Sequence, residues 1–518
     1  MAELKPMTAA LPMELQLMIM RELADAHNSP TSRRRGIASY TCVSKDWQVF
    51  FERLTFKHLI VRPNALPSFR QVTLDPRRQS LVRHVWLRIE KPRPDEEDGL
   101  VAPDDGWSGS CSVESAIALH LLTTLSTWTA RGSGRGLTLE LSSHTYVGLV
   151  RYAEYAPPDD LGLYSKYLET GSLGAYDGLD KFGHTSPRWH DEVASSASRL
   201  AGATSNLFTW GTVEFHTIQL PRVEVVTKLL MRRAGTRNIK ATGLAQIIKS
   251  LPRLEEIHLE RWRIGRATQE KRWLRDFADH LEHGIPPSVK KLAFFHEEID
   301  APHYAYSLPF RAPREELDAF LARRTLHVEC LSLCFVTEAE SFFRHVLQAT
   351  KVNLGSETDG PARANYTEPV PFRSLKLLTL TSTCFVPKEG PYREVYSWQR
   401  SVDEVLLSAA AVVAGIPTLQ LLEIWSGRDG HASIFRYKVN SNNNSATIVW
   451  SSTQDIGVMS SDVIEAWRRT TTLSGGRREL KTEVVRLPRE GFEYHGSVLP
   501  YLDSQGWVVD PVSAAQIV

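Results

Sequence analysis

The sequence predicts an α/β protein with a small helical head, a long body of repeated strand–helix units and a small α+β cap at the C-terminal end. A six-residue apolar pattern recurs along the middle of the chain, amphipathic helices precede several copies, and a hairpin-like pattern replaces it near the end. The chain has 518 residues, of which 42% are hydrophobic and 23% are charged. This composition is typical of a globular protein with enough apolar material for a large core.

The first fifty-odd residues predict a compact helical unit. A helix opens at Leu11-Pro12-Met13-Glu14-Leu15, because proline in the first turn of a helix loses no hydrogen bond. Apolar residues then recur at helical spacing on one face, at Leu11, Leu15, Met18, Ile19 and Leu23. Helical spacing resumes after a polar loop, through Ile37, Tyr40, Ser44, Trp47, Phe51 and Leu54. The unit is too small for an independent enzyme and carries more apolar surface than it can bury alone.

Residues 9–56 resemble an F-box. That family opens with a Leu-Pro-x-Glu-Leu helix, as at Leu11 to Leu15, and carries a later Val-Ser/Cys-Lys-x-Trp element, as at Val43 to Trp47. F-box units dock onto the Skp-type adaptor of a cullin–RING ubiquitin ligase, and the rest of the chain selects a substrate. The resemblance implies that the following residues make or support the adaptor contact: Leu11, Pro12, Leu15, Ile19, Val43 and Trp47. The polar segment from Asp25 to Arg35 departs from the family pattern.

Residues 57–427 predict a solenoid of strand–helix units. The pattern apolar-x-x-apolar-x-apolar begins at Val82, Val226, Leu254, Val289, Val328, Leu375 and Leu419. Its last two apolar positions alternate, as one buried face of a strand requires. We therefore expect strands centred on Ile257, Leu292, Leu331, Leu378 and Leu422 to lie side by side in chain order in one parallel sheet, with right-handed crossovers.

Amphipathic helices are expected between these strands, at 244–251, 274–281, from 317 onward and at 402–413. One strand and one helix cannot bury their own apolar faces, but stacked copies share a continuous core. The strand pattern resembles that of leucine-rich repeats, although the Asn or Cys that normally follows is missing and the spacing is uneven. An ordinary α/β domain with a parallel sheet would show the same alternation.

The repeat pattern lapses at about residues 143–212, which form a long irregular insertion. Long loops in compact domains tend to be functional or disordered. The insertion is rich in aromatic residues, the type that dominates binding hot spots. The sequence leaves two alternatives equally open, packing onto the solenoid or binding of a target by Tyr155, Tyr164, Tyr167, Tyr176 and Trp189.

Residues 428–518 predict the α+β cap that a terminal repeat needs over its exposed face. A β-hairpin is expected over residues 435–450, followed by a short helix capped by Ser461 or Asp462 and a strand at 480–487. The whole layout resembles a large fungal family of F-box-headed proteins. The motifs are Val82 to Glu90, Leu251 to Glu255 and the closing Pro511-Val512-Ser513.

Composition and charge narrow the function classes. The formal net charge of +1 argues against nucleic acid or an anionic membrane as the partner. The 5 cysteines are few and scattered, which indicates a reducing, intracellular location in the cytoplasm or nucleus. Cys330 and Cys334 share one strand face and predict buried thiols rather than a metal site. The longest uncharged run, 405–422, contains Gly415 and Pro417 and does not predict a membrane span.

No catalytic motif or cofactor site is predicted. The glycines at 132–136 follow a helix and precede a strand, the reverse of the order in a phosphate-binding loop. His296-Glu297-Glu298 is interpreted as an exposed polar strand end, and the mixed charges of Glu255 to Glu260 and of Lys290 and Lys291 as a solvated sheet face.

The leading hypothesis is a non-enzymatic substrate-recognition subunit of a Skp–cullin–F-box ubiquitin ligase. It would use no cofactor, bind the adaptor and through it the cullin with its head, and bind an unidentified protein target with its solenoid. The alternative is a protein-interaction scaffold outside any ligase, in which the F-box-like head only caps the solenoid.

Overall fold

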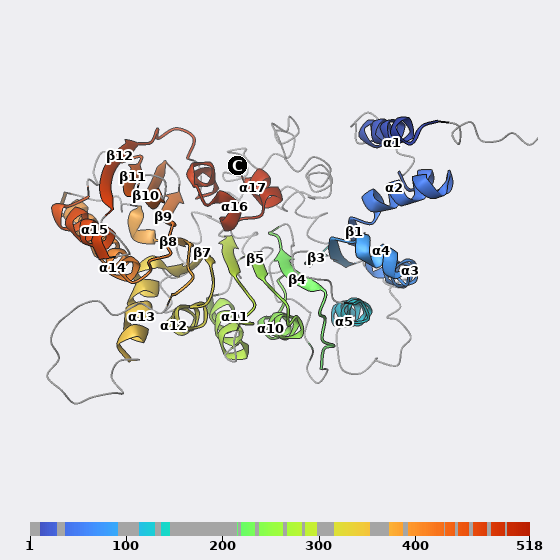
Figure 1. Cartoon of the computed structure of the whole chain (residues 1–518). Coiled ribbons are helices and arrows are strands. Elements are labelled where there is room, and N and C mark those ends of the chain that lie inside the picture. The colour runs from blue at the N-terminus through green and yellow to red at the C-terminus, as the bar shows by residue number, and fades with distance from the viewer. Residues whose placement is uncertain are drawn as a thin grey trace, which may run out of the picture.

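Twelve strands of the described residues form one sheet, in which neighbouring strands follow one another in sequence order from β1 to β12 (Figure 1). The computed structural model describes residues 11–27, 37–91, 113–129, 136–145, 215, 219–233, 238–262, 267–281, 285–297, 315–352, 372–386, 392–428, 430–440, 444–454, 459–473, 478–492 and 495–517. The insertion at about 143–212 therefore lies almost wholly outside the described residues.

The head consists of α1 (Met13–His27), η2 (Ile37–Cys42) and α2 (Lys45–Thr55). Ser44 caps α2, and its hydroxyl accepts a hydrogen bond from the backbone N–H of Trp47 at 3.3 Å. Met20 and Ala24 of α1 are buried against Trp47 and Phe51 of α2, and these side chains form a core separate from that of the body. The head thus folds as its own small packed unit.

The body begins with β1 (His58–Val61), η3 (Pro63–Ala65), α3 (Leu66–Val72), α4 (Pro76–Leu81), β2 (His84–Lys91), α5 (Val113–Ser126), β3 (Leu137–Thr145) and β4 (Val226–Met231). It continues with α10 (Ala241–Ser250), β5 (Glu256–Trp262), α11 (Ala267–His280), β6 (Lys291–Glu297), α12 (Glu315–Arg324), β7 (Cys330–Glu338), α13 (Ala339–Val352), β8 (Leu377–Thr381), η7 (Thr383–Phe385), α14 (Tyr392–Ala414) and β9 (Leu421–Arg428). Four elements were not predicted from the sequence, namely β1, α3, α4 and α13. Strand β1 lacks the six-residue apolar pattern, and the three helices were not recognised from an apolar stripe.

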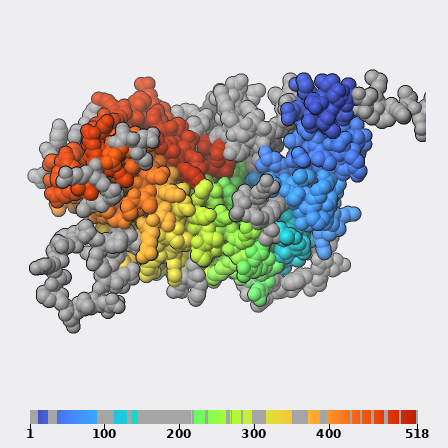
Figure 2. Space-filling model, in the orientation of Figure 1, coloured from blue at the N-terminus to red at the C-terminus, as the bar shows by residue number. Residues whose placement is uncertain are grey.

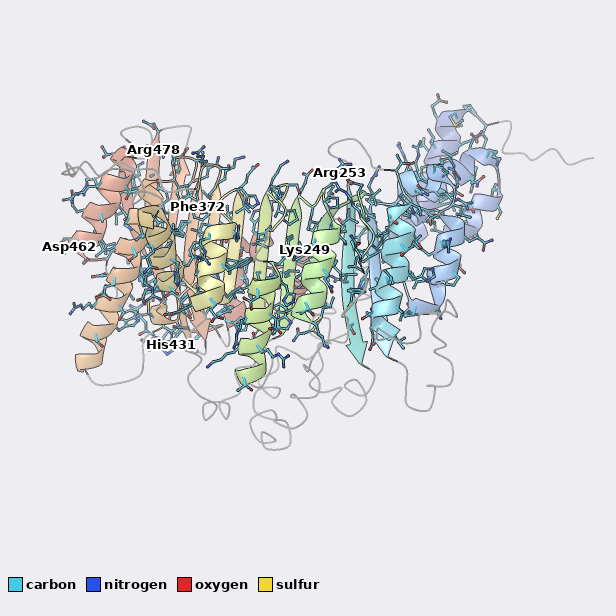
Figure 3. All side chains as sticks on the ribbon, turned by 90° about the horizontal axis from the view of Figure 1, so that it is seen from below. Lys249, Arg253, Phe372, His431, Asp462 and Arg478 are labelled. Atoms are coloured by element: carbon cyan, nitrogen blue, oxygen red, sulfur yellow. The ribbon has the colours of Figure 1, made fainter. Side chains whose placement is uncertain are left out.

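The predicted parallel run of strands is confirmed. Ile257, Leu292, Leu331, Leu378 and Leu422 lie opposite one another in consecutive parallel strands. Figure 3 shows the common direction of the strands: Arg253 and Arg478, just before β5 and β12, lie along one edge, and His431, the first residue of antiparallel β10, lies at the other. The apolar face of the sheet packs against α10 to α14 in one continuous core.

A backbone pattern repeats where the strands begin. The carbonyl of Glu255 accepts hydrogen bonds from the N–H groups of both Lys290 and Lys291, at 2.8 and 3.1 Å. The carbonyls of Lys290, Glu329 and Lys376 each accept two such bonds from the next strand in the same way. The repeat is therefore carried by the backbone, which explains why the uneven sequence spacing does not disturb the stacking of the units.

The sheet continues into the C-terminal region with β10 (His431–Asn440), β11 (Ser445–Ser452), α15 (Ser461–Leu473) and β12 (Glu479–Arg486). The predicted β10–β11 hairpin is confirmed, and β12 pairs with β11 in parallel. The predicted cap of α15 is wrong by one residue: the hydroxyl of Ser460, not of Ser461 or Asp462, accepts the hydrogen bond, from Val463 N–H at 3.3 Å.

The last described segment, residues 495–517, turns back over the sheet face opposite the helices (Figure 1). We call it the tail; it contains η8 (His495–Tyr501), α16 (Gln505–Val508) and α17 (Pro511–Ile517). Figure 2 shows the C-terminal residues, in red, reaching from the end of the body toward the green strands in its middle. The sequence predicted that the C-terminal region caps the last repeat. In the structure it extends the sheet beyond β9, and its tail also covers strands in the middle of the body.

A buried carboxylate joins the head to the body. Glu52 of α2 is 2% exposed and accepts hydrogen bonds from Arg78 at 2.9 Å, from Gln48 and from Arg77. Burial alone would raise the pKa of Glu52, but these hydrogen bonds outweigh it and hold that pKa below its ordinary value of 4.5. The charged form of Glu52 therefore stabilises the junction between α2 and α4.

Glu52→Gln is expected to loosen this junction. Loss of the charge-assisted hydrogen bonds should lower the local stability of α2 by about 1–3 kcal/mol at neutral pH, measured by amide hydrogen exchange. Because the folded pKa is lowered, the contribution of Glu52 is present above its ordinary pKa and is lost as pH falls through the folded value. The local stability of α2 should therefore become the same in the variant and the wild type at acidic pH. Glu465→Gln, in an exposed pair on α15, is the control and should change exchange little.

Candidate functional site

Helix α1 is apolar on two opposite faces. One face, with Met20 and Ala24, is buried in the core of the head. The other carries Leu11, Leu15 and Ile19, which are 37%, 44% and 41% exposed, together with Met18 at 59%. Spacings of three and four residues bring Leu15, Met18 and Ile19 onto the same side of the helix, and Leu11 lies just before its first residue. Packing within the described head therefore uses only one of the two apolar faces of α1.

The structure brings part of the predicted adaptor-binding set together. Leu11, Pro12, Leu15 and Ile19 are exposed at the start and on the outer face of α1. Val43, 51% exposed, stands between η2 and α2. Trp47 is different, because it is 8% exposed and its ring packs 5.6 Å from that of Phe51. Trp47 therefore supports the head from inside, and Met18 is the exposed apolar residue that the predicted set omitted.

The polar face of the sheet is covered at His258 and Glu260, which corrects the expectation of a solvated face there, whereas Glu255 and Lys290 at the start of the strands do reach solvent. His258 and Glu260 of β5 are 4% and 2% exposed. The carboxylate of Glu260 accepts hydrogen bonds from the backbone N–H of Asp510 in the tail and from that of Arg233 at 2.9 Å, and it lies 3.0 Å from His258 Nε2. Burial would raise the pKa of Glu260, but its hydrogen bonds with His258 and Asp510 lower it.

Burial and the neighbouring Glu260 carboxylate raise the pKa of Asp510 in turn. Of these two adjacent carboxyl groups, the charge is thus better accommodated on Glu260, which has more hydrogen-bond donors. This arrangement uses the buried charge of Glu260 to hold the tail on β5.

A second buried group of charges lies on β2, β3 and β4. Glu140 is fully buried, 2.8 Å from His84 Nε2 and 2.6 Å from the Arg232 guanidinium. The Arg232 guanidinium also stacks over Trp86 at 4.8 Å, and the indole N–H of Trp86 donates to Ser142 at 2.7 Å. Burial would raise the pKa of Glu140, but Arg232 and His84 keep it below its ordinary value. These side chains form a buried network that joins β2, β3 and the end of β4.

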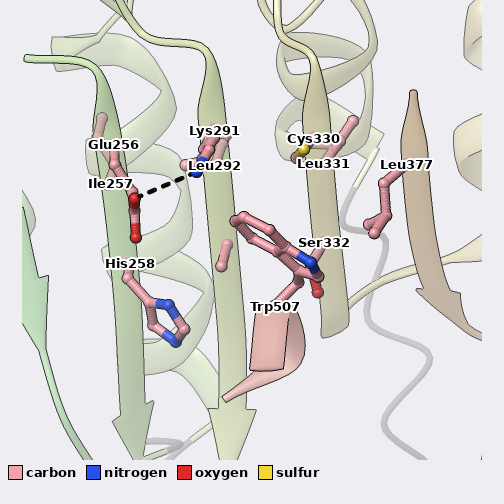
Figure 4. Close-up of a pocket in the computed structure, with 11 residues that line it drawn as sticks. Glu256, Ile257, His258, Lys291, Leu292, Cys330, Leu331, Ser332, Leu377 and Trp507 are labelled. Carbon is pink, nitrogen blue, oxygen red and sulfur yellow. Dashed lines mark ion pairs between the residues drawn. The ribbon is translucent and has the colours of Figure 1, made fainter. Parts of the chain in front are cut away.

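A small hollow remains between the sheet and the tail (Figure 4). Trp507 of α16 stands over the strands, with Lys291 Nζ 4.4 Å from its ring centre, and Glu256 forms ion pairs with Lys228 and Lys291. Cys330 and Ser332 line the same hollow. Burial raises the pKa of the Cys330 thiol, which disfavours the reactive thiolate form.

The prediction of buried thiols is confirmed for Cys334, which is fully buried and whose pKa burial raises to about 12, whereas Cys330 is only partly buried. Within the described ranges, no group of three or more His, Cys, Asp or Glu side chains is placed to hold a metal ion. In the same part of the chain, no helix is both long and apolar enough to cross a membrane.

The interpretation of His296 as part of an exposed strand end is wrong. His296 is fully buried on the helix side of the sheet, and its Nε2 lies 2.7 Å from the Arg261 guanidinium. Arg261 in turn forms a bidentate pair with Glu270 of α11, both contacts at 2.7 Å, and stacks on Trp273. The partners of His296 come from the preceding repeat, which the sequence alone did not indicate.

The far end of the tail contact is anchored by Glu423 of β9. Its buried carboxylate accepts hydrogen bonds from the Ser504 N–H at 2.9 Å, the Asp503 N–H at 3.1 Å and Arg436 at 2.6 Å. Lys438 forms an ion pair with Asp503 beside it, at 2.6 Å. Glu260 and Glu423 therefore fix the tail at two points, on β5 and on β9.

The predicted target-binding residues Tyr155, Tyr164, Tyr167, Tyr176 and Trp189 lie outside the described residues. The tail nevertheless bears on the target question, because it occupies the sheet face from β5 to β9. A partner could reach the sheet face of β5 to β9 only by displacing the tail.

Residues 284–510 match the model of a protein family of unknown function (DUF6546). The match runs from just before β6 to the start of α17, so it covers less than half of the chain and leaves the head outside. No curated protein and no solved structure is significantly similar to the chain. The match therefore relates the second part of the body and its tail to other proteins without indicating an activity.

Glu423→Ala is expected to release the tail. Removing one member of a buried ionic group typically costs about 3–5 kcal/mol, because its partners stay buried without a counter-charge. The expected result is a lower thermal unfolding midpoint and faster proteolysis of residues 495–517. Glu404→Ala, which breaks an exposed pair with Arg400 on α14, is the matched control and should leave both unchanged. A Glu423→Ala protein with the wild-type midpoint and an intact tail would contradict the role of Glu423.

Proposed function

We propose that this chain is a substrate-recognition subunit of a Skp–cullin–F-box ubiquitin ligase. The head would bind a Skp-type adaptor and through it the cullin, and the remainder of the chain would bind a protein target. The contribution to ubiquitin conjugation would be proximity, because holding a target beside the ubiquitin-loaded partner raises the effective concentration of its lysines. The chain itself would act without a cofactor and without catalytic residues.

The observation that carries this proposal is the unused apolar face of α1. Four large apolar side chains on one helix face remain exposed although the head already has a packed core of its own. Contiguous exposed apolar surface of this kind is typical of a protein-binding site. It falls on the residues that the F-box resemblance assigns to adaptor binding, namely Leu11, Leu15 and Ile19.

An intracellular location, in the cytoplasm or the nucleus, belongs to the same proposal, because the adaptor and the cullin act there. The few, scattered cysteines support a reducing compartment. Among the four cysteines that the structure describes, all are free thiols.

The alternative is a scaffold in which the head only caps the solenoid. The contacts of Glu52 with Arg77 and Arg78 do attach the head to the first repeat. That attachment uses α2, however, and leaves the outer face of α1 without a structural purpose in the described chain. The two functions are separated by whether the chain captures an adaptor.

Leu11→Ala combined with Leu15→Ala should abolish adaptor capture and leave the body folded. Truncating large apolar side chains at the centre of an interface typically costs about 2 kcal/mol or more each, which would weaken binding by more than a hundredfold for the pair. Co-purification of a Skp-type adaptor with the full-length tagged chain measures the effect.

Leu74→Ala combined with Leu407→Ala is the matched control, because both leucines are exposed, at 69% and 37%, and lie outside the head. That variant should bind adaptor as wild type does. If the wild-type chain captures no adaptor, the ligase function is wrong and the scaffold function is favoured.

We propose that the target is bound through the insertion, since the tail occupies part of the polar sheet face. Deleting residues 155–190 should spare the thermal unfolding midpoint and adaptor capture but remove co-purifying target proteins. A lower midpoint would show that the insertion contributes packing, and an unchanged set of co-purifying proteins would place recognition elsewhere.

A further inference from the structure

Among the described strands, β12 ends the sheet and has a neighbour, β11, on one side only. The N–H of Leu487 donates to the carbonyl of Ser452 at 2.8 Å, so the backbone of residue 487 faces β11. Backbone groups alternate in direction along a strand. Leu480, Thr482 and Val484 therefore direct their N–H and C=O groups away from β11, toward the outside of the sheet.

The side chains of β12 are exposed on both faces of the sheet, which is unusual for so long a strand. Residues 481–486 are all exposed, with Val484 at 56% and Val485 at 41%. Only Leu480 packs partly against the main core. Natural edge strands are usually short, bulged or covered, because an open edge is a template for another strand.

We propose that β12 pairs antiparallel with β12 of a second copy of this chain, so that the two sheets join into one across a twofold axis at Thr482. The direction of the backbone groups supports this arrangement, because the outward-facing N–H and C=O of Thr482 would form hydrogen bonds with the C=O and N–H of Thr482 in the second copy. Leu480 would stand opposite Val484, and Lys481 opposite Glu483, each contact occurring twice.

The charges at the centre of β12 favour this register over an axis at residue 481 or 483. Antiparallel pairing in a continuous sheet places residues of the same face opposite each other. A shift of the axis to residue 481 would oppose Lys481 to itself and Glu479 to Glu483, and a shift to residue 483 would oppose Glu483 to itself. With the axis at Thr482, the two central charged pairs are complementary instead.

Both faces of β12 would gain contacts. On the helix side, Val484 would acquire an apolar neighbour in Leu480 of the second copy. On the tail side, Lys481 and Glu483 have uncharged cross-strand neighbours on β11, Thr447 and Val449, and each would gain a directly opposed opposite charge in the dimer. A single strand pair is a small interface, so the dimer should be weak and depend on concentration.

Charge exchange tests the proposal in the full-length chain. Sedimentation velocity over about a hundredfold range of concentration should show a monomer–dimer equilibrium for wild type. Glu483→Lys should raise the dissociation constant about tenfold or more, since both attractive pairs become repulsive. Combining Lys481→Glu with Glu483→Lys should restore the dimer, because the pairs are again complementary. Glu479→Lys is the control within β12 and should leave the dimer intact, since Glu479 would face Val485.

A cysteine at the axis tests the register. Directly opposed residues in an antiparallel pair lie within reach of a disulfide, so Thr482→Cys should form a covalent dimer under mild oxidation. Val484→Cys should not exceed the wild-type background, because two copies of position 484 would be four residues apart.

The proposal would be overturned if the wild-type chain stays monomeric. It would also be overturned if the dimer survives Glu483→Lys but is lost when Leu11→Ala and Leu15→Ala are combined. A β12 edge that binds extended peptides while the chain remains monomeric would also contradict it.

Discussion

Parallel sheets are usually covered on both faces, and the way this chain covers the middle of its sheet organises the molecule. Helices α10 to α14 cover one face with an apolar core. The other face carries charged residues beside apolar ones such as Phe295 and Trp425. The tail covers it from β5 to β9 through a second apolar core and through the buried carboxylates of Glu260 and Glu423. Because those charges have protein partners, their burial is tolerated, and the polar face becomes a second interior.

The first face could be predicted from the sequence and the second could not. Alternating apolar residues such as Ile257 and Leu259 report a buried strand face directly, since only burial requires them. The polar residues between them, such as His258, look the same whether they meet water or a distant segment. The partner of Glu260 is Asp510, which is 250 residues away in the chain. His296 was misread for the same reason, because its partner Arg261 lies in another repeat.

The head shows a related limit. The sequence identified Leu11, Leu15 and Ile19 as one apolar stripe, and the structure describes them on one helix face. Helical spacing did not indicate which side of α1 packs internally. The inner face consists of Met20 and Ala24 with Leu17 and Leu23 packed beside them, so Leu23 does not belong to the exposed stripe on which the spacing placed it. The exposure that makes the stripe a docking candidate is thus a property of tertiary packing and had to come from the structure. The aromatic residues of the insertion have no recognisable periodicity, and their arrangement could not be inferred from local sequence.

The position of the tail after the repeats affects how the protein matures. During synthesis the repeats emerge in order from the ribosome and can stack as they appear, since each unit contacts its neighbours. Glu260 and Glu423, however, wait for Asp510 and Ser504, which are made after all of the repeats. Until these residues have emerged, this sheet face keeps its charges in water, and no closed second interior exists. A chain shortened by a premature stop would retain nearly all of its repeats and still display this open face to the quality-control machinery of the cell.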